Sequence, residues 1–396
     1  MNLDFDVCVV GAGPVGSTVS YYLSLKGLSV ALLDKKLKVG YPLQCAGILS
    51  NHIEGLNELP DEVILNTVDG AFLHSSNHIL NIERDDVAYI IDRVAYDQFL
   101  LKRAVDSGVE LINQKATDFD IDNGLTILQN NQIIKSKIIV GCDGYNSEVS
   151  KKMGNIQDNY YASQLLVRIS EDEIVSFRKS NKNVNNFVDV CLLEEALPGF
   201  VWFIPVGNDL YRAGLFSNDC HKEQNDLLIE FLEKYLDFQI IEKYKGFIPI
   251  FNKNNTLTKS KAILLGDAAG QVKPTSGGGL LIAFDACRFA SEYIYKAIVE
   301  DDLSILNQYQ QEFMEKYKNE FTYQLKVQET LNNLSDEDFN NLFLKIKEND
   351  GENLISEYGD MDNQSIVVRE FIKRGLIIKI VPSFLVKKVV DIFGFR

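Results

Sequence analysis

The sequence has no cysteine pair of the CxxC type, although it contains six cysteines, and its four histidines show no HExxH-type spacing. We therefore expect no metal site, and reduced thiols as in a cytoplasmic protein. No apolar run reaches the roughly 18 residues that a membrane-spanning helix requires, and the first residues, MNLDFDVCVVG, predict a strand and not a signal peptide. A cytoplasmic protein is the expectation.

Positive charge is also scarce, with 40 Lys and Arg against 56 Asp and Glu and a net charge of -16. This balance argues against nucleic-acid binding. The exception is the segment Arg369–Arg396, where cations outnumber acids and alternate with apolar residues. Such a segment either lies on an anionic bilayer, which would place the protein at the cytoplasmic face of the membrane, or packs against the main body.

The first residues have the pattern of a dinucleotide-binding unit. A buried strand, Asp6–Val10, runs into GAGPVG at 11–16, which matches GxGxxG and opens a helix that extends to about Lys26. A second apolar strand, Leu28–Leu33, ends in Asp34 at the spacing expected for a carboxylate that binds an adenosine ribose. Strand, glycines, helix, strand and acid follow in the right order, so we predict a Rossmann-type fold.

Two later segments also end in glycines and acids. Ile138–Gly144 is a buried strand that ends in Gly-x-Asp-Gly, at the sheet edge where ligands collect in open α/β folds. Leu265–Ala286 places three glycines directly before an apolar helix, whose free N–H groups and positive dipole end favour negative charge. We predict that these glycines meet the ring edge of a flavin and that Asp267 binds its sugar-alcohol chain.

Cys45 and Arg93 each have two interpretations. Cys45, in a loop of turn-forming residues at 40–49, is either a small buried apolar residue, the commoner case, or a functional group. Arg93 begins a helix at 94–107, an unfavourable end for a cation unless an anion lies near. It therefore faces the diphosphate or flavin edge of a cofactor, or forms a surface ion pair.

From about 160 to 250 the hydropathy alternates with period two, which predicts a separate antiparallel sheet. A hairpin joins strands 200–206 and 210–216, and it carries several aromatic residues, among them Trp202, the single tryptophan. An aromatic sheet face is more often core than ligand wall. A second hairpin is expected at 66–82, with turn signals at Asp69-Gly70 and at 75–77.

Beyond the second glycine-rich loop the pattern is helical. Apolar residues at 3.6 spacing predict a long amphipathic helix over Leu306–Leu325, and Ser335 followed by acids predicts the N-cap of another helix. No internal repeat, low-complexity tract or Pro/Gly/Ser linker divides the chain.

The cofactor-binding segments are distant in sequence, yet all fit one cofactor, and the chain resembles a known family in them. It is similar to flavoproteins of the p-hydroxybenzoate hydroxylase fold and, among these, to the geranylgeranyl reductase family, in particular the archaeal digeranylgeranylglycerophospholipid reductases. Six segments carry the resemblance: GAGPVG (11–16), YPLQCAGILS (41–50), IDRVAYDQFL (91–100), GCDGYNS (141–147), PGFVWFIPVG (198–207) and GDAAGQVKPTSGGG (266–279).

The resemblance implies an α/β fold in which a Rossmann-type FAD-binding domain is interleaved with an antiparallel β-sheet substrate domain, followed by a helical C-terminal region. We expect the FAD domain at 1–68, 88–160 and 255–300. The substrate domain is expected at 69–87 and 161–254, and the helical region at 301–396.

The resemblance also implies the site residues. FAD is expected to contact Gly11, Gly13, Pro14, Gly16, Asp34, Lys35, Cys45, Ala46, Gly47, Arg93, Asp143, Gly266, Asp267, Pro274, Gly277, Gly278, Gly279 and Leu280. A polyprenyl chain is expected along Tyr41, Pro198, Phe200, Trp202, Phe203 and Pro205, with Cys45 and Trp202 as catalytic residues. Family members often carry a further glycine or acid after the cysteine, whereas this chain has Cys45-Ala46-Gly47-Ile48, so the proton donor stays open.

The chemistry that the resemblance implies is saturation of isolated C=C bonds in geranylgeranyl chains, in archaeal ether phospholipid synthesis. Reduced flavin supplies hydride, and the protein orients the substrate and excludes water. Cys45, or a water that it positions, is the hypothetical proton donor. The electron donor, NAD(P)H or ferredoxin, is undetermined. The alternative is an FAD-dependent monooxygenase of an aromatic or prenoid substrate; an electron-transfer dehydrogenase would be expected to carry a ferredoxin-like cysteine cluster.

Overall fold

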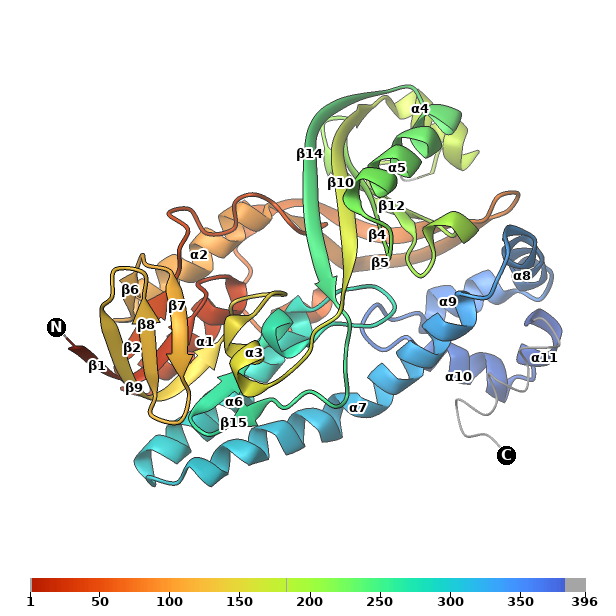
Figure 1. Cartoon of the computed structure of the whole chain (residues 1–396). Helices are drawn as coiled ribbons and strands as arrows, with labels where there is room; N and C mark the ends of the chain where they lie inside the picture. The colour runs from red at the N-terminus through yellow and green to blue at the C-terminus, as the bar shows by residue number, and fades with distance from the viewer. Residues whose placement is uncertain (1, 183, 382–396) are drawn as a thin grey trace.

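The computed structural model describes residues 2–182 and 184–381, which form two eight-stranded sheets and their covering helices (Figure 1). Sheet A runs in the order β15 (Thr258–Lys259), β16 (Ala262–Leu264), β9 (Ile133–Gly141), β1 (Asn2–Val10), β2 (Val30–Leu33) and β6 (Glu110–Ile112). A hairpin of β7 (Ala116–Asp120) and β8 (Leu125–Leu128) pairs with β9.

The centre of sheet A is parallel, and its strands are buried apolar runs. Val7 of β1 lies opposite Val30 of β2 on one side and Ile138 of β9 on the other. Because parallel strands end at one edge, the turns that follow β1, β2, β9 and β16 come together there. This edge is the base of the cofactor site.

Helices cover sheet A. Packed on it are α1 (Pro14–Leu25), α2 (Arg93–Asp106), α3 (Glu148–Met153), α6 (Leu280–Val299) and the long α7 (Leu306–Leu331) (Figure 1). The shared core includes Leu23, Ile294 and Phe313, which are fully or almost fully buried. The predicted long helix is confirmed, and α7 continues it to Leu331.

Sheet B runs in the order β14 (Phe238–Pro249), β10 (Asn159–Ile169), β13 (Leu210–Ser217), β12 (Val201–Gly207), β11 (Phe187–Cys191), β4 (Ile64–His74), β5 (Ile79–Ile91) and β3 (Ile48–Ser50). Neighbouring strands are antiparallel except β11 and β4. One face is covered by α4 (Glu171–Arg178) and α5 (His221–Tyr235).

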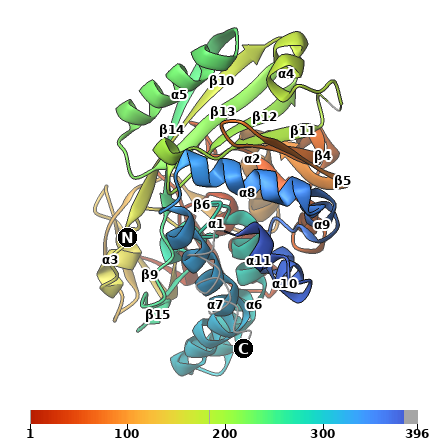
Figure 2. The same ribbon diagram turned by 90° about the vertical axis from the view of Figure 1, so that its right-hand side faces the viewer.

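The described part of the chain, up to residue 381, ends in four helices below sheet B: α8 (Asp336–Glu348), α9 (Gly351–Tyr358), α10 (Ser365–Lys373) and α11 (Ile377–Ile380) (Figure 2). They pack on β5, where Leu80 joins Phe343, Leu354 and Phe371 in one apolar cluster. The predicted N-cap is confirmed, because the Ser335 hydroxyl accepts a hydrogen bond from the backbone N–H of Asp338. Within the described residues, no helix combines the length and the apolar character needed to cross a bilayer.

The structure differs from the sequence predictions at several points. Asp69-Gly70 is not a turn: it lies inside β4, at a shift of the pairing register with β5. The domain boundaries predicted at 68 and 87 therefore fall within strands, since β4 and β5 pair along sheet B from Ile64 to Ile91. The helix α4 was not predicted. The basic apolar end at 382–396 lies outside the described residues.

Candidate cofactor and substrate site

The turn after β1 is held by the acid that ends β2. The Asp34 carboxylate accepts hydrogen bonds from the backbone N–H groups of Ala12 and Lys36, each at 2.8 Å. The carboxylate is partly exposed at the carboxyl edge of the sheet, beside the exposed Lys35. Pro14 starts α1 and Gly13 precedes it, so the uncapped N-terminus of the helix opens on the same edge.

Asp143 has a different environment from the one that its motif suggests. Its carboxylate accepts from the Ser147 hydroxyl at 2.5 Å and from the Glu148 backbone N–H at 2.8 Å, so it stabilises the start of α3. Burial raises the pKa of Asp143, although these hydrogen bonds oppose the rise. Helix capping accounts for this acid, and we leave it out of the proposed cofactor contacts.

Asp267 is an acid without a protein partner. It follows Gly266 after β16, and among the described residues no hydrogen bond reaches its carboxylate. The residue is accessible to a water-sized probe, yet protein atoms surround it closely enough that burial raises its pKa. The Asp267 carboxylate is therefore open to solvent yet closely surrounded by protein atoms, so it lies in a recess of the surface, called the hollow below, where a bound ligand can supply its hydrogen bonds.

The loop from Lys273 to Gly279 borders the same hollow. A Cβ atom on Gly279 would lie 3.6 Å from an Asp267 carboxylate oxygen, and one on Gly278 would lie 2.9 Å from Cε of Lys273. Gly277 has φ +70°, and a Cβ there would lie 2.8 Å from Ile248 of β14. Close packing therefore favours glycine at 277, and also at 279, where a Cβ would lie 2.8 Å from Cγ1 of Val272. No side chain caps α6, so its first N–H groups remain as donors next to Asp267.

Arg93 and Cys45 approach this hollow from two other elements. The Arg93 guanidinium, at the start of α2, donates to both carboxylate oxygens of Asp97, at 3.0 and 3.3 Å from Nη2, and is nine-tenths buried. Burial alone lowers the pKa of Arg93, but Asp97 and the neighbouring Cys45 thiol outweigh it and raise that pKa overall. Arg93 also influences the Asp267 carboxyl electrostatically. Three segments distant in sequence therefore converge here.

The Cys45 loop is fastened to sheet B. Arg212, buried on β13, donates from Nη1 to the backbone carbonyls of Ala46 and Ile91, at 2.9 and 3.1 Å. Gly47 has φ +73°, and a Cβ there would lie 2.0 Å from Nη1 of Arg212. Only glycine therefore admits the guanidinium. Arg212 was not predicted, because its partners lie far from it in sequence.

A hydrogen-bonded chain joins Trp202 to the same loop. The indole N–H of Trp202 donates to Oε1 of Gln164 at 3.2 Å, and Nε2 of Gln164 donates to the Cys45 carbonyl at 3.5 Å. The indole also contacts Gly214, where a Cβ would lie 2.5 Å from Cζ2 of Trp202. The two residues predicted as catalytic, Cys45 and Trp202, are therefore linked through Gln164, which the sequence analysis missed.

The predicted prenyl wall is divided between the two faces of β12. Phe200 and Trp202 lie on the face toward the Cys45 loop, with ring centroids 6.1 Å apart. Phe203 points the other way and is fully buried against Phe177 and Phe231, under α4 and α5. Successive side chains of a strand alternate between faces, so Phe203 does not share a face with Trp202.

The remaining predicted substrate residues are scattered. Pro205 is buried and shares the parity of Phe203 on β12, opposite Tyr211. Pro198 is partly buried before the strand, and Tyr41 is 54% exposed beside Lys38. We therefore retain Phe200 and Trp202 as the aromatic wall and omit Phe203 and Pro205.

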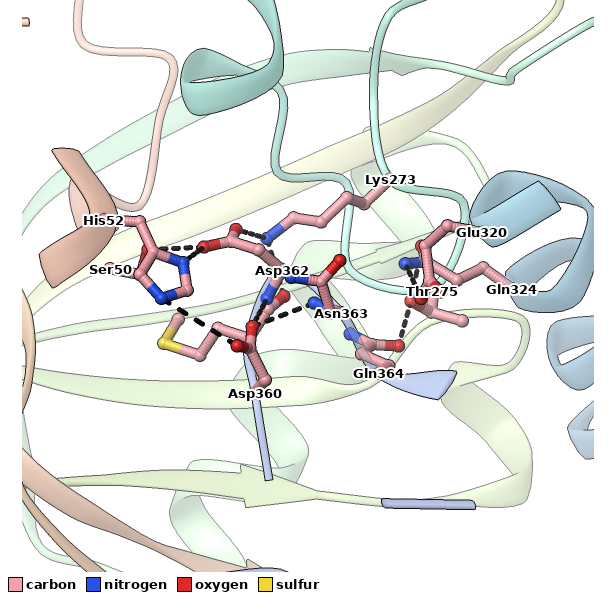
Figure 3. A network of polar contacts seen from close by, with 11 residues as sticks. Ser50, His52, Lys273, Thr275, Glu320, Gln324, Asp360, Asp362, Asn363 and Gln364 are labelled. Carbon is pink, nitrogen blue, oxygen red and sulfur yellow. Dashed lines mark hydrogen bonds and ion pairs between the residues drawn. The ribbon is translucent and has the colours of Figure 1, made fainter. Parts of the chain in front are cut away.

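A polar network outside the predicted set also reaches the glycine loop. Lys273 forms an ion pair with Asp362, which precedes α10, at 2.8 Å, and Asp362 in turn binds Ser50 and His52 at the end of β3 (Figure 3). Lys273 could be noticed in the sequence as the one cation of the VKPTSGGG segment, but its partner Asp362 lies 89 residues away. The site thus includes a C-terminal segment that local patterns did not indicate.

The comparisons with known proteins agree with this arrangement. The family profile described as tryptophan halogenase matches residues 68–324. Digeranylgeranylglycerophospholipid reductase 1 of Methanococcoides burtonii is 30% identical over 88% of this chain and 89% of the relative. A geranylgeranyl bacteriochlorophyll reductase-like protein of Thermoplasma acidophilum has the same fold, with a TM-score of 0.83, 22% identity and coverage of 99% of this chain and 100% of that one. The halogenase PltM, solved with FAD, has a TM-score of 0.66 at 16% identity, covering 94% of this chain and 84% of its own.

Fold and site together define an FAD-dependent oxidoreductase of the architecture shared by flavin hydroxylases, halogenases and prenyl reductases. The uncapped helix ends at the edge of sheet A and the unpartnered Asp267 fit a bound FAD. Within the flavoprotein family that the halogenase profile describes, the chain belongs to the digeranylgeranylglycerophospholipid reductases. The resemblance stated from the sequence motifs is confirmed.

Proposed function

We propose that this protein saturates the C=C double bonds of geranylgeranyl chains on an archaeal-type ether glycerophospholipid, with FAD as its cofactor. The convergence of Asp267, Arg93 and Cys45 on one hollow, with Trp202 on its sheet B side, is the observation that carries the proposal. The names of the relatives support the substrate class.

Several residues would hold the cofactor. Asp34 stands where an adenosine ribose would bind, and the N-terminus of α1 would receive the diphosphate. Asp267 would accept hydrogen bonds from the ribityl hydroxyls, and the N-terminal N–H groups of α6 would face the pyrimidine edge. When bound and reduced, FAD supplies a hydride to the alkene.

The remaining tasks belong to the chain itself. An isolated alkene has no carbonyl to polarise, so the protein must align the chain, exclude water and deliver a proton. Phe200 and Trp202 offer an apolar surface for the alignment. We assign the proton to Cys45 or to a water that it positions, because its thiol lies beside the buried Arg93.

The direct test is incubation of chemically reduced protein with digeranylgeranylglycerophospholipid under anaerobic conditions, followed by mass spectrometry of the lipid. We expect a mass gain of one hydrogen molecule per saturated bond. Oxygen-dependent consumption of reductant with a hydroxylated product would instead select the monooxygenase. The likeness to monooxygenases and halogenases is one of fold, at 17% identity or below in the solved structures compared.

The electron donor and the membrane association belong to the proposal as well. NAD(P)H and ferredoxin are both compatible donors, and stopped-flow reduction of the bound flavin by each distinguishes them. Within the basic apolar segment Arg369–Arg396, Phe371, Ile377 and Ile380 pack in the apolar cluster on β5. We therefore propose that the remainder of the segment, 382–396, holds the protein on anionic membranes. Removal of 383–396 should then weaken binding to anionic liposomes, and unchanged binding would refute this part.

A further inference from the structure

Lys273 is a buried cation in the loop that precedes α6. Only 8% of the residue is exposed, and its ammonium donates to the Asp362 carboxylate and to the Met361 carbonyl, each at 2.8 Å (Figure 3). The ammonium also lies against Gly278, since a Cβ there would be 3.3 Å from Nζ. The backbone reinforces this geometry, because the N–H of Lys273 donates to the Gly278 carbonyl at 3.0 Å.

Asp362 is held in place from several sides. Its carboxylate accepts from the Ser50 hydroxyl at 2.5 Å and contacts Nδ1 of His52 at 3.0 Å, and its own backbone N–H donates to Asp360 at 2.7 Å. Burial alone raises the pKa of Asp362, but Lys273, Ser50 and His52 outweigh it and lower that pKa, so the residue is a carboxylate at neutral pH.

A second set of contacts ties the same two segments together. The Thr275 hydroxyl lies 2.5 Å from Oε1 of Gln364 and 3.2 Å from Oε1 of Gln324 on α7. The backbone N–H of Ser365 donates to Glu320 of α7 at 3.2 Å. The glycine loop is therefore fixed by residues 360–365 and by α7 and not by sheet A alone. Figure 3 shows the contacts of Thr275 with Gln364 and Gln324 beside the Lys273–Asp362 pair.

We propose that the Lys273–Asp362 ion pair sets the electrostatic potential at the glycine loop and thereby the reduction potential of the bound flavin. Lys273 supplies the positive charge, and Asp362 is a positioning residue that holds the ammonium and partly offsets its charge. The inference rests on the proposed function, because it requires FAD at this loop. Two-electron reduction adds negative charge to the flavin ring, and a nearby cation in a poorly solvated site favours the reduced form.

The test is the midpoint potential of bound FAD, measured by dye-coupled reductive titration of the purified holoprotein. Lys273→Met should lower the potential, because the reduced flavin loses a favourable charge. Asp362→Asn should raise it, because the ammonium is no longer offset. The control is Asp118→Asn on β7, the same substitution in an exposed ion pair with Lys152 of α3, which should leave the potential unchanged.

Opposite signs are the diagnostic result. A merely structural role would loosen the loop in both variants, and both potentials would then move in the same direction or stay fixed, which overturns the inference. If Lys273→Met fails to bind FAD, Asp362→Asn decides alone: a rise supports the inference, and a fall or no change rejects it. Wild-type protein that cannot be reconstituted with FAD would refute the proposed function itself.

Discussion

Two buried arginine–aspartate pairs behave differently in this molecule. Arg178 and Asp189, in sheet B and its covering helix, are both fully buried, with Nη2 2.6 Å from the carboxylate. His74 adds a third contact to Asp189, at 2.8 Å. Burial alone raises the pKa of Asp189, but Arg178 and His74 outweigh it and lower that pKa. This pair is closed: its partners are all protein groups.

The pair of Arg93 and Asp97 is open by comparison. The side chains are 10% and 6% exposed, and Nη2 lies 3.0 Å from the carboxylate. Here burial prevails over Arg93 and raises the pKa of Asp97. Arg93 divides its interaction between Asp97 and the Cys45 thiol. The comparison shows how the number of donors separates the two roles. Asp189 is bound by both Arg178 and His74 and stabilises the fold, whereas Arg93 is shared between Asp97 and Cys45 and can also interact with a ligand in the site.

The largest expected effect follows from breaking the closed pair. Asp189→Asn leaves Arg178 charged and poorly compensated in the core, so we expect a loss of about 3–5 kcal/mol in the free energy of unfolding. The matched variant Asp97→Asn should lower the free energy of unfolding by clearly less, because the Asp97 carboxylate accepts hydrogen bonds from Arg93 alone among the described side chains. Urea denaturation followed by circular dichroism measures both. Equal losses would contradict the distinction between the pairs.

The same carboxylate also predicts a pH dependence. The folded pKa of Asp189 is below the value of about 3.9 in an unfolded chain, so its contribution to stability is fully present above that value. The contribution is lost as the pH falls through the folded pKa. In acid the stability of Asp189→Asn should therefore converge on that of the wild type.

The next effect tests the thiol beside the open pair. Cys45→Ala should retain FAD yet lower the rate of double-bond saturation by roughly 100-fold, as expected when a general acid is removed. Cys220→Ala is the matched control, because that thiol is exposed at the start of α5. Lipid mass spectrometry gives the rate and flavin absorbance gives the occupancy. Undiminished turnover would remove Cys45 from the mechanism.

A smaller effect is expected from the guanidinium of the open pair. Arg93→Met removes a charged contact near the cofactor, so we expect FAD to bind about 10- to 100-fold more weakly, equivalent to roughly 1.5–3 kcal/mol. The control is Arg103→Met on the same helix, because the Arg103 guanidinium stacks on the Tyr21 ring. Fluorescence titration of the apoprotein with FAD measures the affinities. An unchanged affinity would mean that Arg93 serves Asp97 alone.

The sequence predicted sheet A well because its information is local. The strands are unbroken apolar runs, and Asp34 stands at a fixed spacing from Gly11. The sequence also contained the information that side chains of β12 alternate between the two faces of the sheet, since Trp202 and Phe203 are adjacent and cannot share a face. The predicted prenyl wall, which included both Trp202 and Phe203, did not take this alternation into account.

Other features were not readable from one sequence. Gly47 and Arg212 are far apart in sequence and come into contact only in the folded chain. Lys273 and Asp362 are 89 residues apart. Asp143 matched a ligand-binding pattern, but the same residue type also caps helices, and the hydrogen bonds decide between the two roles. Long-range polar pairs have no periodic signal, so the structure was needed to reveal them.

The smallest effect concerns the link between Trp202 and the Cys45 loop. Gln164→Leu removes the acceptor of the indole N–H, so the emission maximum of the single tryptophan should move to shorter wavelength, with a stability loss of about 1 kcal/mol. Gln224→Leu is the control, because that buried glutamine binds the Tyr161 carbonyl instead. If Gln164 orients the loop, saturation should slow while FAD stays bound. A spectral shift without a slower reaction would mean that Gln164 only holds the indole. The position of the Cys45 loop would then depend on Arg93 and Arg212.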